Sequence, residues 1–285
     1  MHDYLIRMGG AERVLLELHK LYPAAPIYVL LYDELKMGRF FNGIEIRPSF
    51  LQKFPSFLRT RHKYLLPFLP VAPETFDLRE FDLVISSSSA FAKGVITRPR
   101  TTHINYCHNP AKFLWDYCFE YLDQQNIGLG LKLISKLMAN YLRIWDRAAT
   151  QRVDYFIANS KTTASRIKKF YRREASVIYP PVAKLSANET LAREFLADMP
   201  DNFFLIVSQL TPYKKVDVAV EAFNKLKLNL VVIGEGPQKK YLKRLAGPNV
   251  QILGWRSDEV LAQYFKKCVA FIFPGEDDFG IAPVE

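Results

Sequence analysis

Short apolar runs alternate with amphipathic stretches in the second half of the chain. The runs predict strands at residues 203–207, 230–233, 250–253 and 269–273. The stretches between them carry apolar stripes at helical spacing, at Val216, Ala219, Val220, Phe223 and Leu226, and at Val260, Leu261, Tyr264 and Phe265. Regular strand-helix alternation is typical of a parallel sheet wound with helices, and the last run is expected to be a buried strand.

The first half shows the same two patterns less regularly. Apolar runs predict strands at residues 26–31, 81–86, 102–106, 154–160 and 175–179, the fourth ending at Ser160 as a helix cap. Helical spacing predicts a helix over 11–22 and a long helix over 129–150. The long helix has an apolar stripe that we expect to pack in the core or between domains, comprising Leu129, Leu133, Leu137, Tyr141 and Trp145.

A break in these patterns divides the chain. Pro180-Pro181 ends the last strand of the first half, and a polar helical stretch follows at 188–198. Such a segment favours a hinge between domains. We therefore predict an N-terminal domain over 1–181 and a C-terminal domain over 182–285, both of α/β class.

Composition narrows the functional classes. With 285 residues, 49% hydrophobic and 14% aromatic, the chain has enough apolar surface for two packed domains and is not a disordered protein. No apolar run approaches the ~18 residues of a membrane span, and no signal-peptide pattern opens the chain. Cys107, Cys118 and Cys268 lack the paired spacing of zinc or redox motifs, which favours a reducing cytoplasm and argues against a zinc site.

The net charge of +10 indicates an anionic partner: a nucleotide diphosphate, lipid head groups or nucleic acid. Residues 46–73 contain no acidic residue and interleave basic with aromatic side chains, at Arg47, Lys53, Arg59, Arg61 and Lys63 and at Phe50, Phe54, Phe57, Tyr64 and Phe68. This pattern suits an anionic membrane surface, and it suits a solvated basic face equally well. We expect no nucleic-acid partner, because no helix-turn-helix, RNP or zinc-finger pattern occurs.

The closing stretch, 268–285, has the pattern of a strand, a loop and a helix start. The strand stops at Pro274-Gly275, an acidic loop follows, and Gly280 precedes a helical turn. Open α/β sheets hold anionic ligands at such strand-to-helix junctions. Asp277 and Glu285 lie within this junction and can face one bound ligand. Simple solvation of loop carboxylates is the alternative that spacing alone favours.

Two further strand ends in the second half carry polar signals. Lys214 and Lys215 stand just before the helix at Val216, where a cation opposes the helix dipole. This placement predicts a nearby phosphate, with solvated lysines as the alternative. The turn Gly234-Glu235-Gly236-Pro237 follows the next strand, but Lys239 breaks the G-x-G-x-x-G fingerprint of dinucleotide-binding dehydrogenases.

The first half has two weaker candidates for residues that contact a ligand. Gly9 and Gly10 precede the first helix, where a glycine loop can let a ligand approach the backbone or can be an ordinary turn. His108 follows the strand at 102–106. The turn at Asn109-Pro110 is expected to expose its ring to a substrate, although a lone histidine is more often structural.

These motifs, in this order, resemble the retaining glycosyltransferases of family 4. The resemblance covers nearly the whole chain and rests on the E-x7-E-like closing segment, on YCHNPAKFLWDY, on ANSKTTASRIKKFYRREASVIYPPV and on the GxGP turn at 234–237. It implies the GT-B fold, an α/β architecture of two Rossmann-like domains that face each other across a cleft. It also implies transfer of a sugar from a nucleotide diphosphate sugar with retention of the anomeric configuration.

The resemblance assigns a role to each matching position. Lys214 matches the lysine of an Arg-x4-Lys pair that holds the donor diphosphate, whereas Gln209 stands where the arginine is expected. Asp277, in the place of the first Glu, is implied to hold donor-sugar hydroxyls, Glu285 the ribose hydroxyls, and His108 the sugar from the first domain. The other implied donor-binding positions are Gly9, Gly10, Lys215, Gly234, Gly236, Phe279, Gly280 and Ile281.

The resemblance is nearest to the mannosyltransferase-like branch that builds bacterial polysaccharides. That branch implies GDP-mannose as the donor and a glycan or lipid-linked glycan as the acceptor. It implies no metal and no other cofactor, since lysine and backbone amides stabilise the leaving diphosphate. The implied location is the cytoplasm, peripheral on the inner face of the membrane.

Both ends of the chain depart from the family pattern. Most of the first strand is missing before His2-Asp3-Tyr4, and the C-terminal helices are missing after Glu285, so the chain resembles a fragment trimmed at both ends. We expect the polypeptide alone to be poorly stable and to have little or no transfer activity. The alternative function, which Gln209 and Asp277 favour, is a non-catalytic, membrane-associated protein that binds a nucleotide or glycan.

Overall fold

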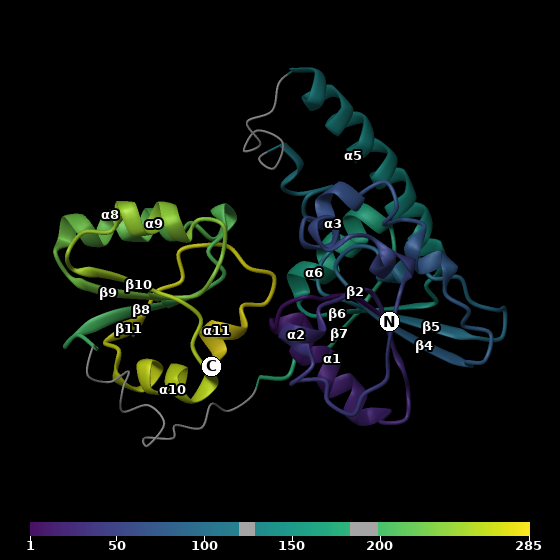
Figure 1. Ribbon diagram of the computed structural model, residues 1–285, viewed down its shortest axis with the longest axis horizontal. Helices are drawn as coiled ribbons and strands as arrows, with labels where there is room; N and C mark the ends of the chain where they lie inside the picture. The colour runs from purple at the N-terminus through teal and green to yellow at the C-terminus, as the bar shows by residue number, and fades with distance from the viewer. Residues whose placement is uncertain (120–128, 183–198) are drawn as a thin grey trace. The chain divides into compact units, whose positions relative to one another are not determined.

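Two compact units make up the chain, Met1–Pro181 and Val182–Glu285. The computed structural model describes residues 1–119, 129–182 and 199–285. Each unit has its own parallel sheet (Figure 1). The polar helix predicted at 188–198 lies outside the described residues.

The first unit is built on a parallel sheet, seven-stranded over the described residues, in the order β3-β2-β1-β4-β5-β6-β7. The chain reverses its direction of winding between β1 and β4, and ligands of open α/β sheets bind outside the carboxyl ends of strands at such a switch point. The strands are β1 His2–Leu5, β2 Ile27–Tyr32, β3 Ile46–Pro48, β4 Leu83–Ser88, β5 Thr102–Cys107, β6 Tyr155–Ala158 and β7 Ser176–Val177.

Helical segments connect these strands. The helices are α1 Gly10–Leu21, α2 Glu34–Met37, α3 Ser56–Thr60, α5 Leu129–Ala149 and α6 Lys161–Arg166. Single-turn segments are η1 Phe50–Lys53, η2 His62–Leu65, η3 Ala72–Thr75, η4 Ala92–Gly94, η5 Thr150–Arg152 and the π-helical η6 Ile167–Tyr171. The cap predicted at Ser160 is confirmed, because its hydroxyl accepts a hydrogen bond from the Thr163 amide at 3.0 Å.

Polar side chains lie inside the central strands of the first unit. Ser86 is fully buried, and its hydroxyl pairs with His103 Nε2 at 2.7 Å and accepts from Asn105 Nδ2 at 2.9 Å. Buried polar groups cost free energy unless they are paired, so these bonds let β4 and β5 carry polar residues in the core. Burial lowers the pKa of His103 to about 4, and the ring is therefore neutral at pH 7.

The long helix α5 does not bury the stripe that the sequence predicted for the core. Leu133, Leu137 and Tyr141 are 61%, 64% and 50% exposed. The buried side instead includes Leu142, with Trp145 partly buried against the same core. Of the two predicted alternatives, packing in the core was wrong for these three residues, because α5 has apolar positions on two faces and only one of them lies against the unit. Packing between domains stays a prediction.

The second unit has a smaller parallel sheet of four strands among the described residues, in the order β10-β9-β8-β11. Its strands are β8 Phe203–Val207, β9 Asn229–Ile233, β10 Val250–Leu253 and β11 Ala270–Phe271. Its helical segments are η7 Pro212–Lys214, α8 Val216–Leu226, α9 Lys239–Leu245, α10 Asp258–Lys267 and α11 Ile281–Val284. In Figure 1, α8 and α9 lie on one side of this sheet and α10 lies on the other.

Side chains at alternate positions of the central strands pack into two hydrophobic cores, one on each face of this sheet. Val232 of β9 packs with Val220 and Phe223 of α8, whereas Val231 packs with Val260 and Tyr264 of α10. Side chains of a strand alternate between faces, which explains why β8 and β9 read as continuous apolar runs. The predicted stripes on α8 and α10 are confirmed, except that Leu226 is 61% exposed.

The closing strand β11 is shorter and less buried than the sequence predicted. It spans Ala270–Phe271 and, among the described residues, pairs with β8 alone, at the edge of the sheet. Val269 is 57% exposed and Phe273 36%. The prediction of a buried strand was therefore wrong, because an edge strand has a neighbour on one side only.

Candidate active site

Three loops of the second unit meet at the carboxyl edge of its sheet. Gly234, at a φ of 151°, lies so close to the loop after β8 that an added Cβ would stand 1.9 Å from the Ser208 carbonyl oxygen. A Cβ on Gly236 would stand 2.3 Å from the Leu210 carbonyl oxygen. The two predicted glycines therefore hold the β9 loop against the β8 loop through close backbone contact.

The third loop, after β11, joins them through Lys214. Its Nζ donates to Asp277 Oδ2 at 2.5 Å, although the two residues are 63 positions apart. A Cβ on Gly275 would come within 2.6 Å of the Lys214 carbonyl oxygen, so only glycine allows this approach. The Lys214 side chain is 10% exposed, and a charge-assisted bond to a carboxylate offsets part of the cost of burying its ammonium group.

The other predicted residues of this edge lie on the same loops. Lys215, at a φ of 53°, is the exposed N-cap of α8, and Gln209 is half-buried in the turn before it. Gly280, at a φ of 77°, precedes the single helical turn α11, which confirms the predicted helix start. Phe279 and Ile281 flank that glycine and are half-buried, as is Glu285 at the end of the turn.

A polar group that sequence reasoning did not single out lies at the ends of β9 and β10. Glu235 accepts from Lys239 Nζ at 2.6 Å and from the Trp255 amide at 3.3 Å. The lysine lowers the pKa of Glu235. The Trp255 side chain is 54% exposed, so it offers a flat ring beside an ion pair.

In the first unit, His108 follows β5 at the carboxyl edge, beside the switch point. Its Nε2 pairs with the Ser87 hydroxyl at 2.8 Å, and the same hydroxyl pairs with His2 Nδ1 at 3.1 Å. His2 Nε2 in turn faces a carboxylate oxygen of Glu12, on α1, at 3.6 Å. Side chains from two strands, one helix and the β5 loop thus form a single polar chain.

This arrangement differs from the expected exposure of His108. The residue is 9% exposed, and its ring packs edge-on against Tyr106 at 5.3 Å. Burial lowers the pKa of His108 to about 3, with the nearby His2 acting in the same direction. The ring is therefore neutral at pH 7, and the Asn109-Pro110 turn leaves it largely covered.

Backbone groups around the switch point are fixed by Asp3. Its carboxylate accepts hydrogen bonds from the amides of residues 89 to 92, at 2.7 to 2.9 Å. Gly9 has an extended φ of −156° and is the N-cap of α1, whose first residue is Gly10. Neither the extended backbone of Gly9 nor the helical backbone of Gly10 requires glycine.

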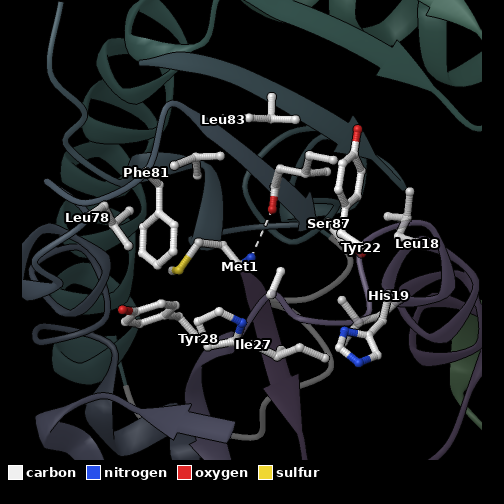
Figure 2. Close-up of a pocket in the computed structure, with 15 residues that line it drawn as sticks. Met1, Leu18, His19, Tyr22, Ile27, Tyr28, Leu78, Phe81, Leu83 and Ser87 are labelled. Atoms are coloured by element: carbon white, nitrogen blue, oxygen red, sulfur yellow. Dashed lines mark hydrogen bonds between the residues drawn. The ribbon is translucent and has the colours of Figure 1, made fainter. Parts of the chain in front are cut away.

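A separate apolar cavity opens at the opposite, amino edge of the first sheet. It holds about 180 Å³ and is lined by Met1, by the starts of β2 and β4, and by α1. Figure 2 shows Met1 at its centre, among Ile27, Tyr28, Phe81 and Leu83. The amino group of Met1 donates to the Ile85 carbonyl oxygen at 2.8 Å, and burial lowers its pKa to about 5. The cavity contains none of the predicted site residues.

The structure thus gathers the predicted residues into two groups, one in each unit. Lys214, Asp277 and their loops form the group of the second unit, and His108 stands with Ser87 and His2 in the first.

Comparison with known proteins identifies the kind of enzyme. The family model described as Glycosyltransferase Family 4 matches residues 8–183, more than half of the chain. The chain belongs to glycosyltransferase family 4. A second model, described as Glycosyl transferases group 1, matches residues 187–285.

Known relatives of this family 4 glycosyltransferase agree with the assignment. An uncharacterized glycosyltransferase of Methanocaldococcus jannaschii, MJ1178, is 24% identical over 99% of this chain and 73% of its own length. The O-antigen chain mannosyltransferase C of Escherichia coli is 32% identical, over 30% of this chain and 25% of its own length.

Solved structures show that the fold is GT-B. Anabaena HepE, in complex with UDP and glucose, is 17% identical, with a TM-score of 0.61 over 98% of this chain and 76% of its own. The sucrose-phosphate synthase of Thermosynechococcus elongatus is 12% identical, with a TM-score of 0.63 over the same shares. The two α/β units with parallel sheets are the Rossmann-like domains of this fold.

Among the described residues, no group of three or more His, Cys, Asp or Glu side chains is placed to hold a metal ion. No described helix combines the length and apolar character needed to cross a membrane.

Sequence reasoning missed Ser87, His2, Glu12 and Glu235 in this glycosyltransferase. The run Ser86 to Ser89 after an apolar stretch was the available signal, because four consecutive serines are unusual at the end of a buried strand. Nothing in the sequence pairs Ser87 with His108, since that contact joins neighbouring strands 21 residues apart in the chain.

Proposed function

We propose that this family 4 glycosyltransferase moves a hexosyl group from a nucleotide diphosphate sugar to a hydroxyl of a glycan or lipid-linked glycan, with retention at the anomeric carbon. The observation that carries the proposal is the contact of Lys214 with Asp277 at the carboxyl edge of β8 and β11. It places a cation and a carboxylate side by side where an α/β sheet binds its ligand.

The proposed chemistry is electrostatic. As the bond from the anomeric carbon to the diphosphate breaks, negative charge grows on the leaving phosphate, and Lys214 together with amides after Gly280 opposes it. The acceptor oxygen bonds to the same face of the anomeric carbon, and its proton passes to the leaving phosphate. No metal or other cofactor takes part in this proposal.

The protein's own residues orient the donor. Asp277 is proposed to accept hydrogen bonds from the sugar hydroxyls, and Glu285 from the ribose hydroxyls. The neutral ring of His108 is proposed to contact the sugar from the first unit. Lys215, Gln209 and Phe279, and the backbone of the glycine turns, are proposed to border the nucleotide.

Two donors should be compared directly. GDP-mannose is the first choice, because the Escherichia coli relative is a mannosyltransferase. UDP-glucose is the competitor, because a structure of HepE holds it. The acceptor is proposed to belong to bacterial polysaccharide synthesis at the inner face of the membrane.

The test follows nucleotide release from each donor and binding of GDP and UDP by calorimetry. Lys214→Ala is expected to lower kcat about 100-fold, the scale seen when one transition-state donor is removed. Lys240→Ala, an exposed lysine of α9, is the matched control and should change neither quantity. A chelator should leave turnover unchanged. Equal turnover by Lys214→Ala and the unaltered chain would contradict the proposal.

The alternative is a non-catalytic nucleotide- or glycan-binding protein. It is favoured by Gln209, which supplies no charge where the resemblance leads one to expect a second cation for the diphosphate. Tight nucleotide binding that depends on Lys214, without any release of sugar, would support this alternative over the transferase.

Attachment to an anionic membrane through 46–73 is part of the proposal. Phe57, Tyr64 and Phe68 are 63%, 58% and 45% exposed, and Lys53 and Arg61 beside them are exposed as well. Phe50 and Phe54 instead pack against the core of the first unit. Aromatic rings flanked by cations are favourable at a head-group boundary.

A further inference from the structure

The long helix α5 exposes an apolar face that the core leaves uncovered. Leu133, Leu137, Tyr141 and Ile144 follow one another at spacings of four, four and three residues, which places them on one side of the helix. Their exposed fractions are 61%, 64%, 50% and 64%, and the adjoining Ile134 is 62% exposed. Apolar side chains that gather in this way mark an interaction surface.

Cations border this face along its whole length. Lys132, Lys136, Arg143 and Arg147 follow at spacings of four, seven and four residues, so they form a second row beside the apolar one. Lys136 and Arg147 are exposed, and Lys132 and Arg143 are half-buried. The apolar row therefore has a positively charged margin.

Negative charge is absent from the exposed side of α5, as far as its side chains are described. The acidic residue of the helix, Asp146, is 1% exposed. Its carboxylate accepts hydrogen bonds from Lys93 and Trp115 inside the unit. The whole chain also carries a net charge of +10. A partner that covers this face must offer apolar contacts next to negative charge.

An anionic lipid surface has this chemistry. A helix lying in the head-group region buries leucine and isoleucine side chains in the acyl boundary, with tyrosine at the interface and lysine or arginine beside the phosphates. Figure 1 shows the N-terminal end of α5 extending away from the sheet of the first unit.

We propose that α5 docks on anionic membranes, with Leu133, Ile134, Leu137, Tyr141 and Ile144 inserted and Lys136 and Arg147 facing the lipid phosphates. This surface is additional to segment 46–73. It extends the membrane attachment in the proposed function, but it does not depend on catalysis.

The α3 and η2 segments share a core with α5, which supports a joint role. Leu58 of α3 and Leu65 of η2 belong to the same apolar cluster as Leu142 of α5. Segment 46–73 and α5 therefore pack on the same hydrophobic core of the first unit. Binding through both would be stronger than through either, since the second contact is intramolecular.

The experiment is flotation of the full chain with lipid vesicles, without donor or acceptor. Vesicles of phosphatidylcholine alone are compared with vesicles that also contain phosphatidylglycerol. The unaltered chain should float with the mixed vesicles and much less with the neutral ones. The combined variant Leu133→Ser, Leu137→Ser and Tyr141→Ser should weaken binding at least about tenfold, because three inserted side chains are lost.

Matched controls separate the face from general surface hydrophobicity. The combined variant Leu35→Ser, Val218→Ser and Leu226→Ser removes side chains that are 99%, 58% and 61% exposed on α2 and α8, and it should bind as the unaltered chain does. Lys136→Gln with Arg147→Gln should reduce the preference for phosphatidylglycerol and the salt dependence of binding, although the cations of segment 46–73 remain. Lys240→Gln with Lys243→Gln, on α9, should retain both.

Three outcomes would overturn the proposal: undiminished binding by the α5 triple variant, equal binding to neutral and anionic vesicles, or no binding of the unaltered chain. A mass measurement in solution accompanies the assay, since dimerisation abolished by the triple variant would assign the face to a second copy. Phe57→Ser with Tyr64→Ser tests segment 46–73 separately. If this double variant binds as the unaltered chain does while the α5 triple variant binds weakly, only the proposal for segment 46–73 is rejected.

Discussion

At the scale of single residues, the hydrogen bonds from Glu12 through His2 and Ser87 to His108 allow one consistent assignment of donors and acceptors. We expect Glu12 to attract the N–H of a neutral His2 ring at Nε2, which leaves His2 Nδ1 to accept from the Ser87 hydroxyl. The hydroxyl oxygen then accepts from His108 Nε2–H. His108 Nδ1 remains as a lone-pair acceptor, suited to a hydroxyl group of a sugar.

This assignment predicts a neutral Nε2–H tautomer of His108. In protein labelled with ¹⁵N-histidine, NMR should show this tautomer, unchanged down to pH 5 because the pKa is lowered to about 3. Ser87→Ala should change the His108 signals and lower kcat about tenfold with a smaller effect on KM. Ser87→Thr, which retains the hydroxyl, should restore both.

The buried His103 supplies the internal control for that experiment. It pairs with Ser86 and the Arg152 carbonyl oxygen, so Ser87→Ala should leave its signals in place. A protonated His108 at pH 6, or the Nδ1–H tautomer, would show that the Ser87 hydroxyl does not accept a hydrogen bond from a neutral His108 ring.

At the scale of elements, a buried ion pair helps to attach α5 to the first unit, beside the core packing of Leu142 and Trp145. Lys93 Nζ donates to Asp146 Oδ1 at 2.5 Å and also to the Ala90 carbonyl oxygen, and Trp115 Nε1 donates to Asp146 Oδ2 at 2.8 Å. Both charged side chains are at most 2% exposed. This network orients the C-terminal half of the helix and therefore the face proposed to meet the membrane.

Removal of one residue of the Lys93–Asp146 pair should lower the stability of the fold. Asp146→Ala leaves the Lys93 ammonium group buried without its counter-charge, and we expect the free energy of unfolding to fall by about 3–5 kcal/mol. Urea unfolding followed by circular dichroism measures the loss.

The double variant Lys93→Met with Asp146→Leu is the comparison, since it removes both charges and keeps apolar volume. It should lose less stability than the single variant. A single variant as stable as the unaltered chain would show that the pair does not hold α5.

At the scale of the whole molecule, stability should depend on pH through buried neutral histidines. The pKa of His103 falls from its usual 6.5 to about 4 on folding, because burial disfavours the charged ring. Below pH 6.5 the unfolded chain binds a proton that the folded chain does not, so stability decreases as the pH falls from 6.5 towards 4. His108 acts with the same sign over a window that extends to about pH 3.

We expect the free energy of unfolding to be lower at pH 5 than at pH 7.5, with His103 alone accounting for about 2 kcal/mol at pH 5. Urea unfolding at a series of pH values measures this dependence. His103→Asn should make the dependence less steep between pH 6.5 and 4 without abolishing it, because His108 still contributes there. An increase in stability on acidification would contradict the assignment of neutral buried rings.

The sequence by itself determined the class of the fold and the positions of its loops. Apolar periodicity located the strands of both units to within a few residues, except β1 and β3, and the Ser160 cap and the helix start after Gly280 follow from local chemistry alone. These features depend on backbone sterics and neighbouring residues, so a linear pattern is enough to predict them.

Only the tertiary structure decided which apolar faces are covered and which distant groups meet. Periodicity shows that Leu137 and Trp145 can both be buried, but the placement of α5 leaves Leu137 exposed and packs Trp145 on the core. The contact of Lys214 with Asp277 and that of Ser87 with His108 arise because adjacent parallel strands bring their carboxyl ends together. Strand order, which no local pattern encodes, determines those neighbours.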